Sequence, residues 1–140
     1  MSYSSQSETI IHAPLPKVWD ALTKPEQVRE WFFGTNMITD WSVGSPIFFR
    51  GSWEGKDYED KGTVLEYSAL KSLSYSYWSV MSGLPDKPEN YMHVTYEVTE
   101  VDGGTKLVIK QSNVATQEKA DHSNENWKMV VGELAKFLAK

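Results

Sequence analysis

The 140-residue sequence contains no cysteine, and this absence excludes several kinds of chemistry. Without a thiol there can be no disulfide framework, no thiolate zinc site, no iron–sulfur cluster and no cysteine nucleophile. Basic residues are also scarce: 14 Lys and Arg stand against 19 Asp and Glu, which leaves a formal net charge of −5. Because a negative net charge opposes phosphate binding, we expect no nucleic-acid partner.

Long apolar runs and targeting segments are missing as well. No stretch approaches the roughly 18 apolar residues that a membrane-spanning helix needs. The first five residues, Met1 to Ser5, lack the basic segment and the apolar run of a signal peptide. These features predict a cytoplasmic protein without a membrane partner.

Aromatic side chains, in contrast, are abundant: the sequence has six Trp, seven Tyr and five Phe. Hydrophobic residues make up 40% and charged residues 24% of the chain, which is the balance of a globular protein. A chain of this length can bury a core of its own. The sequence therefore predicts a single domain over residues 1–140, in which the aromatic residues need an explanation.

The spacing of apolar residues predicts an alternation of strands and helices. Apolar positions at i, i+3, i+4 and i+7 from Leu15 to Leu22 indicate a helix. Thr23 to Glu26 has the spacing of a capping box, which predicts a second short helix ending near Trp31. An apolar stripe that begins at Trp127 predicts a long final helix. Alternating apolar residues and turn signals predict strands at 7–12, 47–53, 62–67, 73–78, 92–101 and 105–112.

These elements predict an α+β fold, in which a curved antiparallel sheet wraps around a long C-terminal helix and two short helices follow the first strand.

Several short motifs, in a fixed order along the chain, carry a resemblance to a known superfamily. They are Ile11-His12-Ala13-Pro14, Val18 to Thr23, Trp31-Phe32, Asp40-Trp41 with Val43-Gly44, Gly62 to Glu66, Val94 to Val98, Gly103 to Leu107, and Trp127 with Leu134. With these motifs the sequence resembles the START-like (SRPBCC) superfamily, and within it the Aha-type branch, which is named after an activator of a heat-shock protein ATPase. The resemblance covers nearly the whole chain. It implies a helix-grip (Bet v-type) fold with an internal, mostly apolar cavity.

Aromatic residues are expected to line the inner face of this grip. The candidate ligand-binding residues of this kind are Trp31, Phe33, Phe49, Trp53, Tyr77, Tyr96 and Trp127. Tyr and Trp suit a pocket because each joins apolar area to one hydrogen-bonding group. Gln111, at an inward strand position, could bind a carbonyl or hydroxyl group of a ligand, or could bond a backbone group within the core. The alternative is that the rings fill the grip and leave no cavity.

Glu66 is the candidate acid or base. It lies on the expected strand that begins at Gly62, where an inward carboxylate could take part in proton transfer. The alternative is a glutamate that faces solvent or pairs with a lysine.

Metal and cofactor sites are not indicated. The three histidines, His12, His93 and His122, share no metal-ligand spacing. Asp57, Glu59 and Asp60 are interpreted as the solvated tip of a hairpin, since the spacing and the glycine of an EF-hand are absent. Motifs for covalent catalysis and nucleotide binding are missing too. The sequence therefore predicts no metal, no cofactor and no catalytic residue.

The sequence leaves three functions open. The first is a non-enzymatic protein, monomeric or weakly dimeric, that holds a hydrophobic or aromatic small molecule in the cavity. The second, suggested by the name of the family, is association with a chaperone in a stress response, through an outer surface that includes Phe48 and Arg50. The third is an enzyme of lyase, cyclase or hydrolase type that uses Glu66 and a tyrosine as acid and base.

Overall fold

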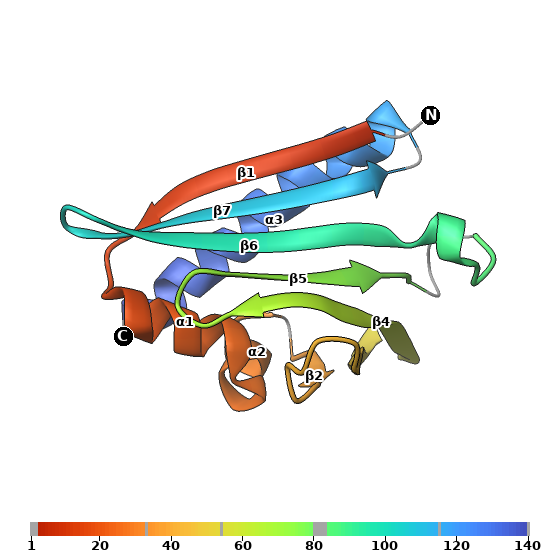
Figure 1. Ribbon diagram of the computed structural model, residues 1–140, viewed down its shortest axis with the longest axis horizontal. Coiled ribbons are helices and arrows are strands. Elements are labelled where there is room, and N and C mark those ends of the chain that lie inside the picture. Colours follow the sequence, from red (N-terminus) through yellow and green to blue (C-terminus); the bar gives the residue numbers. More distant parts are fainter. Residues whose placement is uncertain (1–2, 33, 54, 80–83, 115, 140) are drawn as a thin grey trace.

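In the residues that the structure describes, one antiparallel sheet and three α-helices make up the fold (Figure 1). The computed structural model describes residues 3–32, 34–53, 55–79, 84–114 and 116–139, and of Trp53 the backbone alone. In chain order the elements are β1 (Tyr3–Ile11), α1 (Leu15–Thr23), α2 (Pro25–Trp31), β2 (Asn36–Ile38), β3 (Pro46–Trp53), β4 (Lys56–Ser68), β5 (Ser72–Tyr77), the 3₁₀ turn η2 (Pro88–Asn90), β6 (Met92–Val101), β7 (Gly104–Val114) and α3 (Gln117–Leu138).

Within the described part of the chain, seven strands follow the order β1-β7-β6-β5-β4-β3-β2. The long helix α3 crosses one face of the sheet, behind β1, β7 and β6 in Figure 1, and α1 and α2 lie near the C-terminal end of α3. The predicted α+β fold, with a curved sheet around a long terminal helix, is confirmed. The short strand β2 pairs with β3 at the edge of the sheet and was not predicted, because three residues are too few to reveal an alternation.

The final helix begins and packs as its sequence dictates. The hydroxyl oxygen of Thr116 accepts a hydrogen bond from the backbone N–H of Lys119 at 3.1 Å, which caps the first turn. Farther along, Val130, Leu134 and Leu138 are buried against the sheet. This stripe fixes which face of α3 looks into the interior.

The junction between α1 and α2 differs from the prediction. Thr23 is the last residue of α1, and its hydroxyl donates to the carbonyl oxygen of Trp19 at 2.8 Å, one turn earlier. Lys24 takes the N-cap position of α2, with Pro25 in the first turn and no side-chain cap. The predicted capping box is therefore wrong, because Thr23 already bonds within the preceding helix.

Strand β4 is longer than the sequence pattern indicated. It begins at Lys56 rather than Gly62, and pairs along its first half with β3. Alternation then turns Tyr58 and Asp60 inward while Asp57 and Glu59 face solvent. The interpretation of these acidic residues as a solvated hairpin tip is wrong for Asp60, which is 7% exposed.

A register shift in β4 explains the position of Glu66. Val64 pairs with Tyr75 and Glu66 with Ser74, so one extra residue of β4 lies between these two pairs. The extra residue reverses the alternation, and Tyr67 instead of Glu66 turns inward. Glu66 is exposed, and the expectation of an inward carboxylate at this position is wrong.

Aromatic rings fill the end of the grip that is nearest α1. The indole N–H of Trp19 donates to the hydroxyl of Tyr67 at 3.2 Å, and Trp41 stacks on Tyr67 with ring centroids 5.7 Å apart. Trp41 also donates its indole N–H to the carbonyl oxygen of Thr23 at 2.9 Å. At this end the aromatic residues are core, as the alternative interpretation of the sequence had it.

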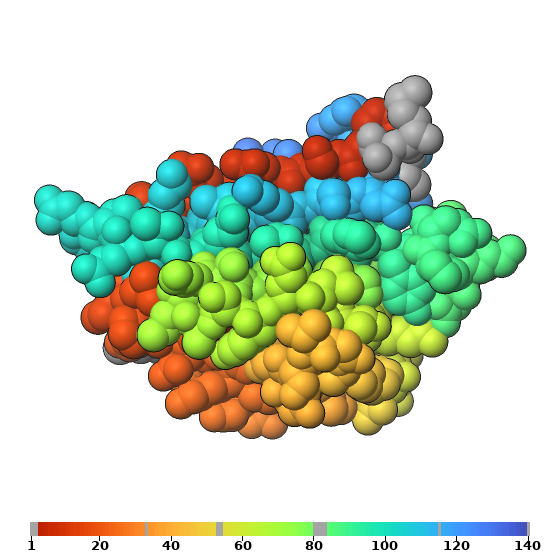
Figure 2. Space-filling model, in the orientation of Figure 1, coloured from red at the N-terminus to blue at the C-terminus, as the bar shows by residue number. Residues whose placement is uncertain are grey.

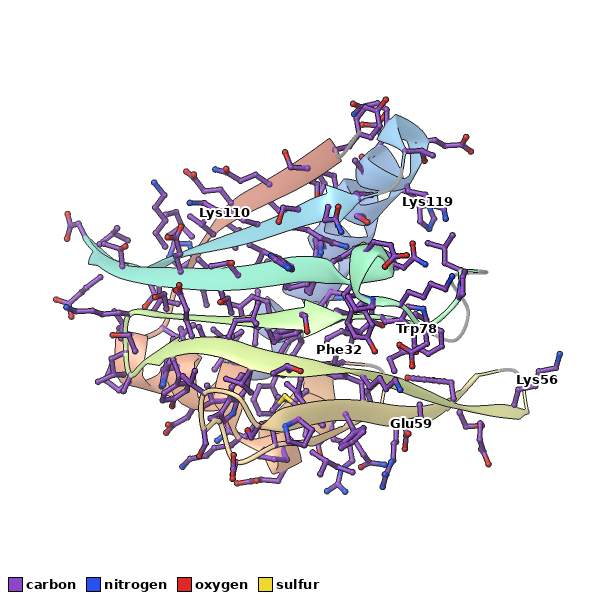
Figure 3. All side chains as sticks on the ribbon, turned by 45° about the vertical axis from the view of Figure 1, so that its right-hand side comes forward. Phe32, Lys56, Glu59, Trp78, Lys110 and Lys119 are labelled. Atoms are coloured by element: carbon purple, nitrogen blue, oxygen red, sulfur yellow. The ribbon has the colours of Figure 1, made fainter. Side chains whose placement is uncertain are left out.

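The opposite face of the sheet carries charged side chains. Figure 2 views the molecule from this side, with α3 behind the strands. Ion pairs link neighbouring strands here, with Lys110 bound to Glu97 at 2.7 Å and Lys106 to Glu8 at 3.3 Å, and Lys110 and Glu59 point away from the interior in Figure 3. No helix in the described part of the chain is both long and apolar enough to cross a membrane.

Candidate functional site

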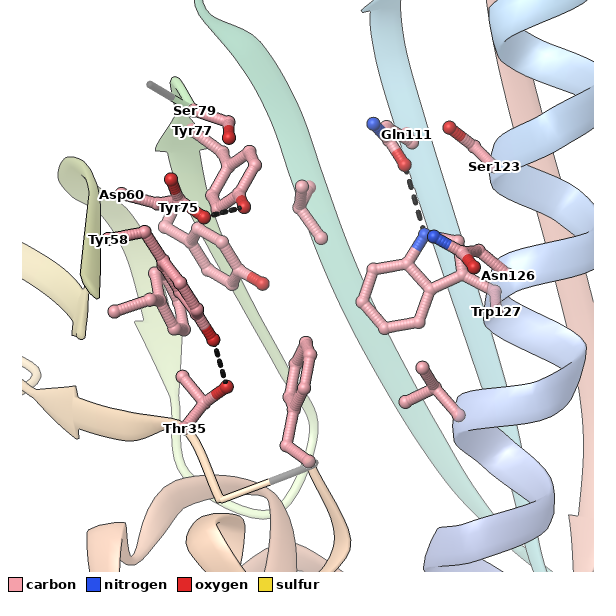
Figure 4. Close-up of a pocket in the computed structure, with 14 residues that line it drawn as sticks. Thr35, Tyr58, Asp60, Tyr75, Tyr77, Ser79, Gln111, Ser123, Asn126 and Trp127 are labelled. Carbon is pink, nitrogen blue, oxygen red and sulfur yellow. Dashed lines mark hydrogen bonds between the residues drawn. The ribbon is translucent and has the colours of Figure 1, made fainter. Parts of the chain in front are cut away.

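A cavity of about 380 Å³ lies between α3 and the inner face of the sheet (Figure 4). Its apolar and aromatic walls come from Phe32, Phe49, Tyr75, Val94, Trp127 and Val130. Its polar lining comes from Thr35, Tyr58, Asp60, Tyr77, Ser79, Gln111, Ser123 and Asn126. Asn126 is exposed, so the cavity meets solvent beside the N-terminal half of α3.

The helical wall of the cavity has a simple geometry. Ser123, Asn126, Trp127 and Val130 stand at i, i+3, i+4 and i+7, which places them on one face of α3. The first two are polar and the last two are apolar. The face that looks into the cavity therefore changes from hydrogen-bonding to hydrophobic along the helix.

Gln111 on β7 fixes the orientation of Trp127. The side-chain oxygen of Gln111 accepts a hydrogen bond from the indole N–H of Trp127 at 3.0 Å, and its amide group donates to the sulfur of Met92 at 2.9 Å. Trp127 also meets Tyr96 edge to face, with ring centroids 5.9 Å apart and planes at 84°. The indole is therefore a fixed wall of the cavity.

Across the cavity, a carboxylate and a phenol form a second polar pair. The hydroxyl of Tyr77 on β5 donates to Asp60 on β4 at 2.5 Å. Burial, and then the neighbouring Asp60 charge, hold the pKa of the Tyr77 phenol well above its usual range. Tyr77 therefore keeps its proton at neutral pH and donates a hydrogen bond to Asp60.

Next to this pair, the Tyr58 hydroxyl shares a hydrogen bond of 2.8 Å with the hydroxyl of Thr35. The opposing strand leaves room for the ring because residue 51 is glycine: a Cβ there would lie 2.6 Å from the Tyr58 hydroxyl oxygen. Figure 4 shows both hydrogen-bonded pairs on this wall, and the position of Tyr58 in the second pair depends on the absence of a side chain at Gly51.

Tyr75 in the cavity wall shares a buried hydrogen bond with Tyr96, which lies behind it. The hydroxyls of Tyr75 and Tyr96 lie 3.0 Å apart and their rings meet edge to face. Burial raises the pKa of Tyr96 to about 12 and that of Tyr75 well above its usual range. Both phenols stay neutral, so neither Tyr75 in the cavity wall nor Tyr96 behind it adds a charge.

The structure brings together four of the predicted site residues: Phe49, Tyr77, Gln111 and Trp127 all line the cavity. Trp31 is buried one layer away, where its indole N–H donates to the carbonyl oxygen of Ala21 at 2.8 Å. Tyr96 lies in the layer behind Tyr75. Glu66 is on the outer side of the sheet, so an acid–base pair of Glu66 with a cavity tyrosine does not form. Phe33 and the side chain of Trp53 lie outside the described part of the structure.

Several lining residues were missed by the sequence analysis, although some left a signal. Tyr58 and Asp60 lie on the same inward face of β4 as Gly62 and Val64, because every second residue of a strand shares a face. The cluster of acidic residues in this segment obscured that alternation. Ser123 and Asn126 share the helical spacing of Trp127, but their polarity gave no reason to place them inside. Thr35 and Phe32 belong to the irregular segment around β2, which carries no periodicity.

Outside the cavity, two features bear on the other predictions. Arg50 on β3 pairs with Glu59 and lies 5.3 Å from the centre of the Phe48 ring, on the outer side of the strand. Chaperone association through this surface stays a prediction. In the described residues, no three His, Asp or Glu side chains come together as a metal site would need.

The sequence can now be compared with known proteins. A family model described as activator of Hsp90 ATPase homolog 1-like protein matches residues 12–139. The chain belongs to this family. The Aha-type resemblance inferred from the sequence motifs is thereby confirmed. No curated protein matches the chain.

Solved structures of similar proteins share the fold of this chain. The solution structure of ChR145 from Cytophaga hutchinsonii is 42% identical, with a TM-score of 0.84, and the match covers 98% of this chain and 94% of that one. MLL2253 from Mesorhizobium loti is 23% identical, with a TM-score of 0.80 and coverage of 98% and 97%. DynU16, a protein of the dynemicin biosynthetic locus, is 19% identical, with a TM-score of 0.81, and the match covers 98% of this chain and 47% of that one.

Proposed function

We propose that this protein binds a small molecule with a flat, hydrophobic body in the cavity between α3 and the sheet. The observation that carries the proposal is the cavity itself, with a volume of about 380 Å³. Small-molecule sites have volumes of roughly 300–1,000 Å³ and are mostly apolar with a few convergent polar groups. The volume found here suits a compact ligand rather than a long lipid chain.

The arrangement of the walls supports a ligand that is held from two sides. Phe32 and Trp127 meet edge to face at 6.3 Å, and Phe49 meets Tyr75 at 5.5 Å, so aromatic surface lies on both sides of the cavity. Polar groups face each other across it, with Asp60 and its neighbours on the sheet side and Ser123 on the helix side. Such a site would hold the body by apolar contact and orient it through hydrogen bonds.

Binding rather than catalysis is the function that these groups support best. The predicted catalytic pair fails because Glu66 faces solvent. The hydroxyl and amide groups of the cavity, such as Tyr77 and Gln111, already bond protein neighbours and serve to hold the walls in place.

Native and denaturing mass spectra of the freshly purified protein test the proposal. We expect a small mass that copurifies and is lost on unfolding, or, for an empty cavity, uptake of the neutral aromatic probe 2-naphthalenemethanol measured by calorimetry. Val130→Phe, which pushes a ring into the cavity, should abolish both signals. Met129→Phe makes a similar change one residue away on the exposed side of α3, where Met129 is 56% exposed, and should leave both intact.

Two results would overturn the proposal. One is a wild-type protein that carries no small molecule and takes up no probe. The other is probe uptake that survives Val130→Phe unchanged, since the probe would then bind elsewhere.

A further inference from the structure

The described lining of the cavity carries a single formal charge, and it is negative. Among the lining residues that the structure describes, Asp60 is the one with a formal charge at neutral pH, and none is Lys, Arg or His. The carboxylate is 7% exposed and sits on the inner side of β4. A charge held in such a place interacts with a ligand through protein rather than through water, and therefore more strongly than a surface charge.

Asp60 accepts a hydrogen bond from another residue of the cavity wall. Tyr77 donates to one carboxylate oxygen, and a carboxylate that accepts a phenol hydrogen bond forms a charge-assisted bond. Tyr58 lies on the same strand and the same side, two residues earlier, and contributes a second hydroxyl oxygen to this wall. The polar end of the cavity on the sheet side thus presents oxygen atoms, one of which belongs to a carboxylate.

Aromatic rings lie beside this end of the cavity and across from it. The Phe49 ring lies 5.6 Å from Tyr77 and 5.5 Å from Tyr75, and Trp127 stands on the opposite side as a fixed wall. The faces of aromatic rings attract cations. Both the carboxylate of Asp60 and the neighbouring aromatic rings therefore favour a positively charged group of a ligand at this end of the cavity.

We propose that the cavity selects an organic cation, a protonated amine on a flat hydrophobic body, with its ammonium group at Asp60 and its body against Trp127. This inference rests on the proposed function and adds the charge of the ligand to it. A carboxylate or phosphate ligand would meet the Asp60 charge with no basic group among the described lining residues to offset it. The net charge of −5 also favours the approach of a cation.

The test uses three probes that share a naphthalene ring system and differ in charge. They are 2-naphthylmethylamine, which is protonated at neutral pH, the neutral 2-naphthalenemethanol and the anionic 2-naphthoate. Titration calorimetry on the full chain at low salt gives the three dissociation constants. We expect the amine to bind about tenfold more tightly than the alcohol, and the naphthoate to bind more weakly than both.

Two matched variants assign the preference to one carboxylate. Asp60→Asn removes the charge from the cavity and should make amine and alcohol bind about equally. Asp57→Asn makes the same chemical change three residues earlier on β4, where the side chain faces solvent, and should keep the preference of the wild type. The affinity of each variant for the alcohol reports whether its cavity is intact.

The possible outcomes separate the two proposals. If the alcohol binds and the amine binds no better, the inference about charge is wrong and the proposed function stands. If none of the three probes binds the wild type, the inference about charge is wrong, and the proposed function fails with it when no small molecule copurifies either. If Asp57→Asn loses the amine preference as fully as Asp60→Asn, the preference comes from net charge and the assignment to Asp60 is wrong. The wild-type series decides the sign of the preference even if Asp60→Asn does not fold.

Discussion

Trp127 on α3 donates its indole N–H to the side-chain oxygen of Gln111 on β7 across 3.0 Å, and this hydrogen bond joins helix to sheet beside the cavity. Gln111 is 6% exposed, and its amide group also reaches the sulfur of Met92. The pair is thus part of the packing of the protein and at the same time part of the cavity wall.

Replacing Gln111 by Leu should destabilise the fold. The change leaves the indole N–H of Trp127 without its acceptor in a partly buried place, so the free energy of unfolding should fall by about 1–3 kcal/mol. Trp127→Phe removes the donor, and the double variant should lose less than the sum of the two single losses. Urea denaturation of the wild type and the three variants measures this coupling. Strictly additive losses would mean that the hydrogen bond between Trp127 and Gln111 contributes nothing to stability.

The space beside Tyr58 gives a second prediction. A methyl group in Gly51→Ala would lie 2.6 Å from the Tyr58 hydroxyl oxygen, so the ring must move and lose its bond to Thr35. We expect binding of 2-naphthalenemethanol to weaken by about 1 kcal/mol, roughly fivefold, because this wall changes shape. Ser52→Ala, an exposed position on the same strand, is the control. Equal affinity in Gly51→Ala would mean that Tyr58 does not shape the binding site.

The two sides of the site differ in how far the sequence reveals them. Gln111 and Trp127 follow the periods of a regular strand and a regular helix, and both were predicted to face inward. Asp60 was not, because three acidic residues in a short segment resemble a solvent-exposed tip. Their alternation becomes meaningful only once β4 pairs with β3, which depends on contacts distant in sequence.

Glu66 shows the opposite failure, in which a clear alternation gives the wrong face. The extra residue between the Val64 and Glu66 pairs reverses the side on which every later residue of β4 lies. Nothing in the local sequence marks this bulge. Inward and outward faces are therefore predictable along a continuous ladder and become uncertain across a register shift.

The end of the fold near α1, which aromatic side chains fill, should respond to substitution differently from the end that holds the cavity. Trp19→Phe removes the bond to Tyr67 and leaves a small void among buried rings, so we expect a loss of about 1–3 kcal/mol in unfolding free energy. Affinity for 2-naphthalenemethanol should not change, because Trp19 does not line the cavity. Trp127→Ala should instead weaken binding strongly. Comparable loss of affinity in both variants would contradict the division into a filled end and a hollow end.

Alkaline pH should destabilise the fold through the buried tyrosines. Burial raises the pKa of Tyr96 to about 12, whereas an unfolded tyrosine has a pKa near 10, so the folded state keeps a proton that the unfolded state loses. The contribution of Tyr96 to stability is therefore fully present below about pH 10 and is lost as the pH rises toward about 12. Across this window the unfolding free energy should fall by roughly 1.4 kcal/mol per pH unit for each such tyrosine.

Tyr96→Phe isolates this effect, because it removes the ionisable hydroxyl and keeps the ring that packs on Tyr75 and Trp127. Urea denaturation at a series of pH values should give a smaller alkaline slope for the variant than for the wild type. The variant also loses the 3.0 Å bond between the two hydroxyls, so it should be less stable at neutral pH, where neither group ionises. If the two proteins lost stability in parallel above pH 10, Tyr96 would ionise as readily in the folded state as in the unfolded state. The Tyr96 hydroxyl would then not be buried and neutral behind the cavity.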